Sequence, residues 1–478
     1  MSLQLKFQTD FESFSNDFLD ICKTFYPRIE LVDDGAIVDY SVEKVDEKNY
    51  NLRLEFAGND EISPQQVEQK FHFDEILSPL KNKSLLKRVS KIFLYDFLSQ
   101  LSGVALPYGS LTGIRPTKLF HEFTQEGIDA RSYFVNELRV SEQKIDLIEE
   151  ICNNQKKFYV SDEGQVDIFV NIPICVTRCV YCSFISAQLD KIKPLVQPYC
   201  DALVEELQET RRLVQAKNYK VRSVYVGGGT PTSLTAQQLD QVLEQCDFGC
   251  PEFTVEAGRP DTITREKLDA MARHNVTRIS INPQTFCQQT LDFVGRKHSI
   301  QDIYDKFELA RKYNFDINMD LIAMLPNENL ETFSHSVDCA IALKPDNITV
   351  HTLAIKRGSR LKEIGYENQL DEELPFKMVD YAYAALKGAG YSPYYMYKQK
   401  YVSGNLENIG YCAKNKQCIY NIDIMEELNS IIANGAGGIS KRVFPSQNRI
   451  ERLPIPKAIE VYLERKEASI ANKNKFFE

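Results

Sequence analysis

The stretch Asp167–Phe184, DIFVNIPICVTRCVYCSF, decides how the rest of the chain is interpreted. Its apolar, β-branched beginning predicts a strand, which leads into a loop that carries Cys175, Cys179 and Cys182. Three thiolates in one short loop can each bind an iron of a [4Fe–4S] cluster, whose full protein ligation needs a fourth cysteine. One iron of such a cluster is therefore left open for a ligand that is not protein.

A structural zinc site is the main alternative for closely spaced cysteines. Such sites usually pair two Cys-x2-Cys or Cys-x2-His units, which give four ligands in a closed tetrahedron. No second unit with that spacing is present: Cys246 and Cys250 are four apart, Cys412 and Cys418 are six apart, and neither pair has a third member. The spacing favours a cluster over zinc, and over three apolar cysteines that lie together by chance.

The composition is that of a globular protein with room for two or three domains. The chain has 478 residues, of which 43% are hydrophobic and 26% charged. Its net charge of −10 argues against nonspecific binding to nucleic acid or to an anionic membrane surface. No apolar run approaches the roughly 20 residues of a membrane span. The first residues, MSLQLKFQTDFESF, lack the pattern of a secretory signal, so we expect a cytoplasmic protein whose 12 cysteines are thiols or metal ligands.

Three regions follow one another along the chain. Residues 1–160 combine a strand hairpin, at 36–40 and 50–56, with helical segments, and they predict an α+β accessory domain. Residues 161–390 alternate strands and helices. The alternation stops after that, and residues 391–478 predict a small C-terminal domain that packs on the mouth or edge of the middle domain.

The middle region predicts six βα units and hence an α/β fold. Successive units of this kind give a parallel sheet with short right-handed crossovers. Polar residues recur at the C-terminal ends of the strands, where barrel sites are built. A partial (βα)6 barrel of the TIM type is therefore favoured over a doubly wound sheet. The predicted strands are 167–172, 223–226, 253–257, 278–282, 317–322 and 348–353.

Residues suited to a cofactor site follow several of these strands. The turn GGGT at 227–230 can expose backbone groups to a ligand, although most such turns only connect elements. Glu256 ends the third strand, and its carboxylate could accept hydrogen bonds from a ribose diol. Arg296, in the sequence FVGRKH, could pair with a carboxylate. Gln284 and Asp320 lie near the ends of the fourth and fifth strands.

A basic cluster follows the sixth strand. Lys356, Arg357 and Arg360 lie within the sequence IKRGSRL. An anionic substrate would need such local groups, because the chain as a whole is acidic. These residues are the best candidates for binding substrate carboxylates, and a solvated helix start is an equally simple interpretation.

These motifs resemble the radical S-adenosylmethionine (SAM) enzymes, in which SAM chelates the open iron of the cluster. The aromatic Tyr181 just before the third cysteine belongs to that likeness. Residues 165–360 taken in order resemble the oxygen-independent coproporphyrinogen III oxidase (coproporphyrinogen dehydrogenase) family. The sequences GIRPTKL at 113–119, NLENIGY at 405–411 and NIDIMEE at 421–427 are similar to its HemZ-like branch. The resemblance implies a radical-SAM (βα)6 barrel.

The resemblance also implies a role for individual residues. The cluster ligands are Cys175, Cys179 and Cys182, and the SAM on the cluster is bound by Gly228, Gly229, Thr230 and Glu256. Positions that contact a second SAM in the family are matched by Tyr181, Gln284, Arg296 and Asp320. Phe169 stands where the family strand pattern Y-x-H-I-P-F-C has tyrosine and is counted with the cofactor-binding residues. No side chain is assigned a catalytic role, because the chemistry takes place on the cluster and SAM.

The activity implied is the oxidative decarboxylation of coproporphyrinogen III. A reduced cluster cleaves SAM, and the resulting 5′-deoxyadenosyl radical takes hydrogen from a propionate β-carbon. Loss of carbon dioxide and one electron leaves a vinyl group, and two rounds give protoporphyrinogen IX. The implied partners are a tetrapyrrole substrate and a low-potential electron donor. The oligomeric state is left open.

Three departures from the family pattern keep other functions open. Asn171 replaces the pattern's histidine, Phe184 stands in place of a fourth cysteine, and Met324 in place of a glycine. The first two favour a haem-binding or haem-delivery protein that retains the cluster, with His351 and His298 as possible axial ligands. A third interpretation is a radical SAM enzyme that acts on haem or another tetrapyrrole.

Overall fold

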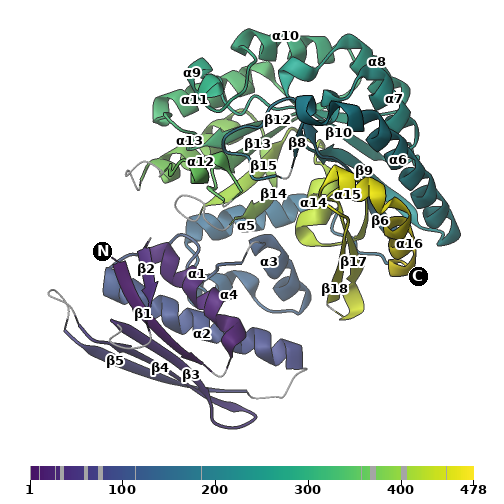
Figure 1. Ribbon diagram of the computed structural model, residues 1–478. Coiled ribbons are helices and arrows are strands. Elements are labelled where there is room, and N and C mark those ends of the chain that lie inside the picture. The colour runs from purple at the N-terminus through teal and green to yellow at the C-terminus, as the bar shows by residue number, and fades with distance from the viewer. Residues whose placement is uncertain are drawn as a thin grey trace. The chain divides into compact units, whose positions relative to one another are not determined.

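The chain forms two compact units, Met1–Glu149 and Glu150–Glu478 (Figure 1). The structure is a computed structural model. The contacts divide the chain once, near residue 150, whereas the sequence suggested boundaries near 160 and 390. The described residues are 2–9, 11–26, 28–32, 37–58, 63–73, 79–113, 115–184, 186–356, 358–366, 373–399, 406–447 and 449–478.

The first unit contains a sheet of five strands in the order β2-β1-β3-β4-β5. β1 is parallel to β2 and β3, and β3, β4 and β5 form an antiparallel meander. Every second residue of β4 is buried, as a half-buried strand requires. The predicted hairpin is confirmed as β3 and β4. The bounds are β1 Ser2–Thr9, β2 Arg28–Leu31, β3 Val38–Lys44, β4 Asn49–Phe56 and β5 Gln65–His72.

Helices complete this unit. Aromatic rings from α1, α2 and the sheet form its core, as where Phe18 lies against Tyr40 with ring centroids 4.8 Å apart. Pro116 occupies the first turn of α3, where its missing N–H costs no hydrogen bond. The helices are α1 Ser15–Phe25, α2 Pro79–Ser102, α3 Pro116–Gln125, α4 Ala130–Asn136 and α5 Glu142–Gln155, and a short 3₁₀ helix spans Glu12–Phe14.

The second unit is built on a sheet of 11 strands, and its centre is the predicted barrel. Six strands lie side by side in sequence order, and each is parallel to the next, which confirms the six predicted strands. This order is that of a partial barrel whose helices cover the outside of the sheet (Figure 1). The strands are β6 Gln165–Ile172, β9 Lys220–Gly228, β10 Glu252–Gly258, β11 Arg278–Ile281, β12 Asp316–Ala323 and β13 Asn347–Thr352.

Helices and short turns connect these strands. Three of the helices, α7, α10 and α11, begin with a capping box in which Thr235, Ser299 or Asn329 is the N-cap. The helices are α6 Leu189–Ala216, α7 Ala236–Glu244, α8 Arg265–Arg273, α9 Gln288–Phe293, α10 Ile300–Ala310, α11 Leu330–Leu343, α12 Arg360–Glu363 and α13 Leu374–Gly388. The short pieces are strands β7 Ile174–Cys175 and β8 Ala187–Gln188 and 3₁₀ helices Pro231–Ser233 and Pro260–Thr262.

The C-terminal region extends the barrel sheet at both edges. β15 pairs antiparallel with β13 at one edge, while β16 pairs parallel with β6 at the other. This is why residues after 391 belong to the same unit as the barrel. The elements are β14 Ser392–Lys398, β15 Glu407–Cys412, α14 Ile419–Glu426, β16 Ser430–Asn434, β17 Ile439–Phe444, β18 Arg449–Pro454, α15 Ile459–Glu464, α16 Lys466–Phe476 and a 3₁₀ helix at Pro445–Gln447.

A buried ion pair fastens the end of the chain to the barrel. The Nζ of Lys473 in α16 lies 2.6 Å from Oε1 of Glu206 in α6, and both side chains are almost fully buried. The same Nζ donates to Asn434 at the end of β16, and Tyr462 donates to the second oxygen of Glu206. Every charge in this cluster is therefore paired and hydrogen-bonded, as burial demands.

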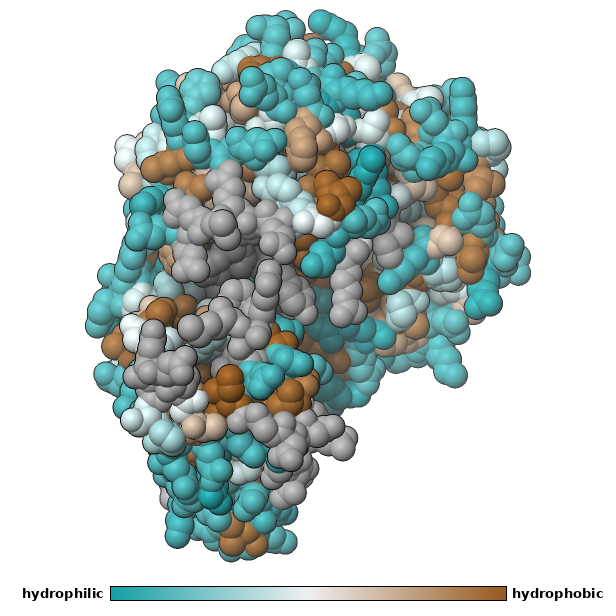
Figure 2. Space-filling model, turned by 60° about the vertical axis from the view of Figure 1, so that its left-hand side comes forward, coloured by the Kyte–Doolittle hydropathy of each residue, from teal (hydrophilic) through white to brown (hydrophobic). Residues whose placement is uncertain are grey.

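None of the helices within the described ranges has both the length and the apolarity to cross a bilayer. The face in Figure 2 is mainly hydrophilic, and its hydrophobic residues lie in small separate patches.

Candidate cluster and cofactor site

The three predicted cluster ligands lie in the loop that follows β6. Cys175 ends the short strand β7, and Cys179 and Cys182 lie in the turn that leads towards β8. The backbone of Val180 in the middle of this loop is held from both sides. Its N–H donates to the carbonyl of Val294 at 3.1 Å, and its carbonyl accepts from the N–H of Leu361 at 2.9 Å. The loop is thus tied to segments that follow β11 and β13.

A cavity of about 270 Å³ opens at this loop. It is lined by the cluster loop, the glycine turn and the C-terminal ends of the barrel strands, as expected for a (βα) barrel. The structure brings together most of the residues singled out in the sequence. The lining includes Cys175, Cys179, Cys182, Tyr181, Gly228, Gly229, Thr230, Glu256, Gln284, Arg296, Asp320 and Lys356.

The three thiols fit a polynuclear cluster better than a single ion. All three line the cavity, yet among the described residues no three His, Cys, Asp or Glu side chains converge closely enough to hold one metal ion. A cluster asks for one thiolate per iron, so its ligands stand apart around the cube. Burial raises the pKa of the Cys182 thiol to about 11, and bound iron would displace that proton. The donor set therefore suits a [4Fe–4S] cluster with one open iron.

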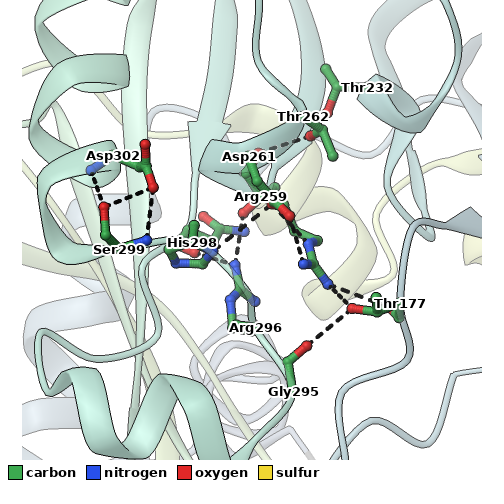
Figure 3. A network of polar contacts seen from close by, with 12 residues as sticks. Thr177, Thr232, Arg259, Asp261, Thr262, Gly295, Arg296, His298, Ser299 and Asp302 are labelled. Atoms are coloured by element: carbon green, nitrogen blue, oxygen red, sulfur yellow. Dashed lines mark hydrogen bonds and ion pairs between the residues drawn. The ribbon is translucent and has the colours of Figure 1, made fainter.

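A buried arginine clamps the cluster loop (Figure 3). Arg259 follows β10, is 3% exposed, and makes a two-pronged ion pair with Asp261 at 3.0 and 2.8 Å. Its Nη1 donates to Oγ1 of Thr177, between the first two cysteines, at 2.6 Å. Thr177 in turn donates to the carbonyl of Gly295. Neither Arg259 nor Asp261 was singled out in the sequence, because nothing local shows that RPD would meet the cysteine loop.

A second buried arginine, Arg296, holds Tyr181. Its guanidinium donates to the Tyr181 hydroxyl at 3.3 Å and to the carbonyls of Gly258 and Asn282 at 3.2 and 2.5 Å. The pairing of Arg296 with a carboxylate stays a prediction, and its hydrogen-bond partners within the described residues are neutral oxygens. Arg296 thus joins the loop to the ends of β10 and β11 while remaining in the cavity wall.

The glycine turn after β9 packs directly on the cluster strand. A Cβ on Gly229 would lie 2.7 Å from the backbone nitrogen and oxygen of Ile174, which is closer than real Cβ contacts allow. Gly228 has a φ of +101°, a conformation that favours glycine. The Thr230 hydroxyl donates to Sγ of Cys175 at 3.6 Å. The glycines are therefore required by the contact between two backbones, in addition to any approach of a ligand.

Glu256 lies at the end of β10 with its carboxylate towards the cavity. Tyr225 of β9 donates a hydrogen bond of 2.5 Å to its Oε1. Burial raises the pKa of Glu256 to about 7, and the nearby Asp320 acts in the same direction. A carboxylate whose pKa lies near neutrality is typical of functional sites.

Gln284 and Asp320 are joined through the backbone. Gln284 has a φ of +69°, which is rare for residues other than glycine and asparagine. Its N–H donates to the carbonyl of Asp320 at 2.9 Å. Its carbonyl accepts from Ile322, so an isolated bridge forms between Gln284 and β12. Asn318 donates to the Asp320 carboxylate at 2.8 Å. Both predicted residues are thereby fixed in the same wall.

A polar wall from β13 and the C-terminal strands completes the cavity. Tyr397 of β14 has its hydroxyl 3.1 Å from Nδ1 of His351, whose Nε2 lies 3.8 Å from Asp320. Gln399 and Asn408 also line the cavity. Tyr397 belongs to the C-terminal region and was not singled out in the sequence.

The basic cluster is only partly at the cavity. Lys356 lines it and is half-buried, and burial lowers the pKa of its ammonium group. Arg360 is exposed at the start of α12 and is not part of the lining, and Arg357 lies outside the described residues. Arg178, which the sequence did not single out, does line the cavity, and it donates to the carbonyl of Gly358 at 2.5 Å.

Four further residues of interest lie as follows. Phe169 does not line the cavity and instead stacks near Tyr420. Met324 is buried with a φ of +67°, and its side chain is not in the lining. His298 is buried and is not in the lining, and burial lowers its pKa to about 4. Phe184 is at the cavity and 69% exposed.

Comparison with known proteins agrees with this geometry. The profile of the Radical SAM superfamily matches residues 171–340, which run from the cluster strand to α11. The chain is 37% identical over 418 residues to the oxygen-independent coproporphyrinogen-III oxidase-like protein HemZ of Bacillus subtilis, a match that covers 84% of this chain and 83% of that protein.

More distant similarities cover less of the chain. The heme chaperone HemW of Bacillus subtilis is 32% identical over 195 residues, 39% of this chain and 50% of that protein. The solved structure of coproporphyrinogen III oxidase (HemN) from Escherichia coli superposes with a TM-score of 0.52 at 18% identity, and the match covers 67% of this chain and 73% of that one. This last similarity shows a shared fold.

Proposed function

The chain belongs to the radical SAM family of the oxygen-independent coproporphyrinogen-III oxidase-like protein HemZ, and on this premise we propose that it decarboxylates coproporphyrinogen III oxidatively to protoporphyrinogen IX. It is a radical SAM oxidoreductase that uses a [4Fe–4S] cluster and SAM. When bound, the reduced cluster supplies the electron that cleaves SAM to methionine and a 5′-deoxyadenosyl radical.

The chain's own residues hold and orient these groups. Cys175, Cys179 and Cys182 would bind three irons, and the turn at 228–230 with Glu256 would bind the SAM on the open iron. Tyr181, Gln284, Arg296 and Asp320 line the same cavity and are the candidates for a second SAM. All of them lie around one cavity, so the cluster, SAM and substrate would be held next to one another.

The observation that carries the choice of substrate is the position of Lys356. Lys356 lines the cavity that holds the cysteines and Glu256, and the exposed Arg178 lies at the same cavity. These are local cations in a chain whose net charge is −10, so they suit a substrate with carboxylates. Phe184 lines the same cavity, and its exposed ring can lie against an apolar macrocycle.

The proposed step balances without a proton donor from the protein. With the cluster and SAM bound, SAM would supply the acceptor for one hydrogen atom from the β-carbon of a propionate, and 5′-deoxyadenosine would be its product. The substrate radical then loses carbon dioxide and one electron and becomes a vinyl group. The electron passes to an external acceptor, and a separate low-potential donor reduces the cluster.

A second candidate, haem binding or delivery, is favoured by one residue. His351 lines the cavity and could reach a haem iron, as a protein of the heme-chaperone type would require. Its two ring nitrogens already face Tyr397 and Asp320, so haem ligation would first have to release one of them. An enzyme that acts on haem or another tetrapyrrole would use the same cavity.

The test is an anaerobic assay of reconstituted protein with SAM, a low-potential reductant and coproporphyrinogen III. The proposal predicts one 5′-deoxyadenosine for each vinyl group formed, hence two for each protoporphyrinogen IX. It also predicts much slower turnover for Lys356→Met than for Arg360→Met. Tight haem binding in a one-to-one ratio with no release of 5′-deoxyadenosine would instead establish the delivery function. Haem ligation through His351 would show as a loss of that complex in His351→Ala.

A further inference from the structure

Helix α14 of the C-terminal region is anchored to the two barrel strands that carry Tyr225 and Glu256. The carboxylate of Glu252, the first residue of β10, accepts hydrogen bonds from the backbone N–H groups of Ile419 and Tyr420 at 2.7 and 2.9 Å. A carboxylate suits this place, because the first N–H groups of a helix lack partners within the helix. A C-terminal helix is therefore held at the amino-terminal end of β10.

A second anchor comes from β9. Nε of Arg222 lies 2.7 Å from the carboxylate of Asp423 in α14, whose side chain is fully buried. Arg222 and Tyr225 belong to the same strand, as Glu252 and Glu256 do on β10. Both anchors thus act on the strands whose far ends carry the cofactor site.

Between the anchors, Tyr420 enters an aromatic stack inside the barrel. Its ring lies 4.5 Å from that of Tyr225 with an angle of 20° between the planes, and 6.2 Å from Phe169 at 16°. Tyr420 is 5% exposed. Stacked rings at these separations attract one another beyond the effect of burial alone. The stack therefore fixes the plane of the Tyr225 ring.

The hydroxyl of Tyr225 ends this chain of contacts at Glu256. It donates to Oε1 at 2.5 Å. The other oxygen, Oε2, lies so close to Gly227 that a Cβ at that position would be 2.8 Å from it. Tyr225 itself is not part of the cavity lining, whereas Glu256 is. One carboxylate oxygen is thus held from behind the cavity wall.

We propose that Tyr225 is the positioning residue of the SAM site: its hydroxyl orients Glu256 towards the ribose diol of SAM, and Tyr420 of the C-terminal region holds Tyr225 in place. The inference rests on the proposed role of Glu256 as a SAM ligand. It assigns the C-terminal region a role in cofactor binding, although Tyr420 and Glu256 are about 160 residues apart in the sequence.

The groups around Glu256 support this role for a hydrogen bond from Tyr225. Asp320 of β12 faces it and favours protonation, whereas His351 of β13, the N–H of Gly228 and the Tyr225 hydroxyl favour the ionised form. An ionised carboxylate is the stronger acceptor for a diol. Asp320 and burial favour the protonated form of Glu256, and removing the Tyr225 hydroxyl would remove one of the groups that favour the ionised form.

The experiment compares Tyr225→Phe with Tyr420→Phe. Both remove one hydroxyl and keep the ring, but only the first removes the hydrogen bond to Glu256. The SAM dissociation constant is measured by equilibrium dialysis of anaerobically reconstituted protein without tetrapyrrole, together with the iron content. We expect Tyr225→Phe to weaken SAM binding about tenfold and Tyr420→Phe to change it less than about twofold.

Tyr420→Leu tests the support by the ring. We expect it to weaken SAM binding about threefold at unchanged iron content and unchanged helical circular dichroism. Equal SAM affinity in Tyr225→Phe and wild type would overturn the inference, as would equal losses in Tyr225→Phe and Tyr420→Phe. Because no tetrapyrrole is present, a failure of the decarboxylation assay would leave this result untouched.

Discussion

Nη1 of Arg259 lies 2.6 Å from Oγ1 of Thr177, although the two residues are 82 positions apart in the chain. Arg259 comes from the segment after β10, and Thr177 lies inside the cysteine loop. Asp261 is a close counter-ion for the guanidinium and offsets part of the cost of burying this cation next to the loop. The cluster loop is thus held by a pair formed elsewhere in the barrel.

We predict that Arg259→Met lowers cluster retention. The substitution removes the hydrogen bond to Thr177 and leaves the Asp261 carboxylate without its partner, which should cost about 3 kcal/mol in the free energy of unfolding. Iron per chain after anaerobic reconstitution and urea unfolding would measure both effects. Arg273→Met is the control: its pair with Asp240 is largely exposed, so we expect a loss below about 1 kcal/mol. Full iron loading in Arg259→Met would contradict this role.

The free energy of unfolding of the ligand-free protein should depend on pH through the ionisation of Glu256. Its pKa is raised by burial from 4.5 to about 7, so the folded state holds this proton more tightly than the unfolded state does. The contribution of the group is fully present below pH 4.5 and is lost as the pH rises through 7. Glu256→Gln lacks this dependence.

We therefore predict that Glu256→Gln gains in stability relative to wild type as the pH rises from 4.5 to 7, and that the difference is constant above that range. The measurement is a series of urea unfolding curves for both proteins without SAM. A difference that stays flat across the whole interval would show that the carboxyl has an ordinary pKa in the folded protein.

Lys356 and Arg360 should behave differently towards a carboxylate-bearing tetrapyrrole. Lys356 lines the cavity, whereas Arg360 is exposed on α12. Loss of a charge-assisted contact of this kind weakens binding about tenfold, so we expect that loss for Lys356→Met and none for Arg360→Met. Binding can be followed by the quenching of protein fluorescence. The methyl esters of the ligand, which lack free carboxylates, should bind both variants alike. If Lys356→Met still bound the free carboxylate form more tightly than the esters, this lysine would be excluded as the anchor.

The C-terminal helix should depend on Lys473. Lys473→Met leaves Glu206 buried without its counter-ion, and breaking a buried pair in this way costs about 3–5 kcal/mol. Lys466→Met, about two turns away in α16, removes an ion pair with the exposed Glu205 and should cost less than about 1 kcal/mol. Thermal and urea unfolding of both variants would compare them. Equal losses of stability in the two variants would mean that the buried pair of Lys473 contributes no more than the exposed pair of Lys466.

Local patterns were sufficient for the cluster loop and for the parallel strands. The spacing of Cys175, Cys179 and Cys182 is a property of one short loop, and strand periodicity is a property of each segment taken alone. The ends of parallel strands meet at one edge, so Glu256, Gln284 and Asp320 could be assigned to a common site before any contact was known. All three do line the cavity.

Contacts between distant segments settled what those patterns left open. The pairing of β16 with β6 and of β15 with β13, the clamp of Arg259 on Thr177, and the approach of Tyr397 to His351 all join residues far apart in the chain. Such contacts form only when the whole core is packed, and their free energy depends on burial and geometry that no short window of sequence contains. The same holds for the hydrogen bonds of Arg296 to two carbonyl groups and to the hydroxyl of Tyr181, which come from other segments of the barrel.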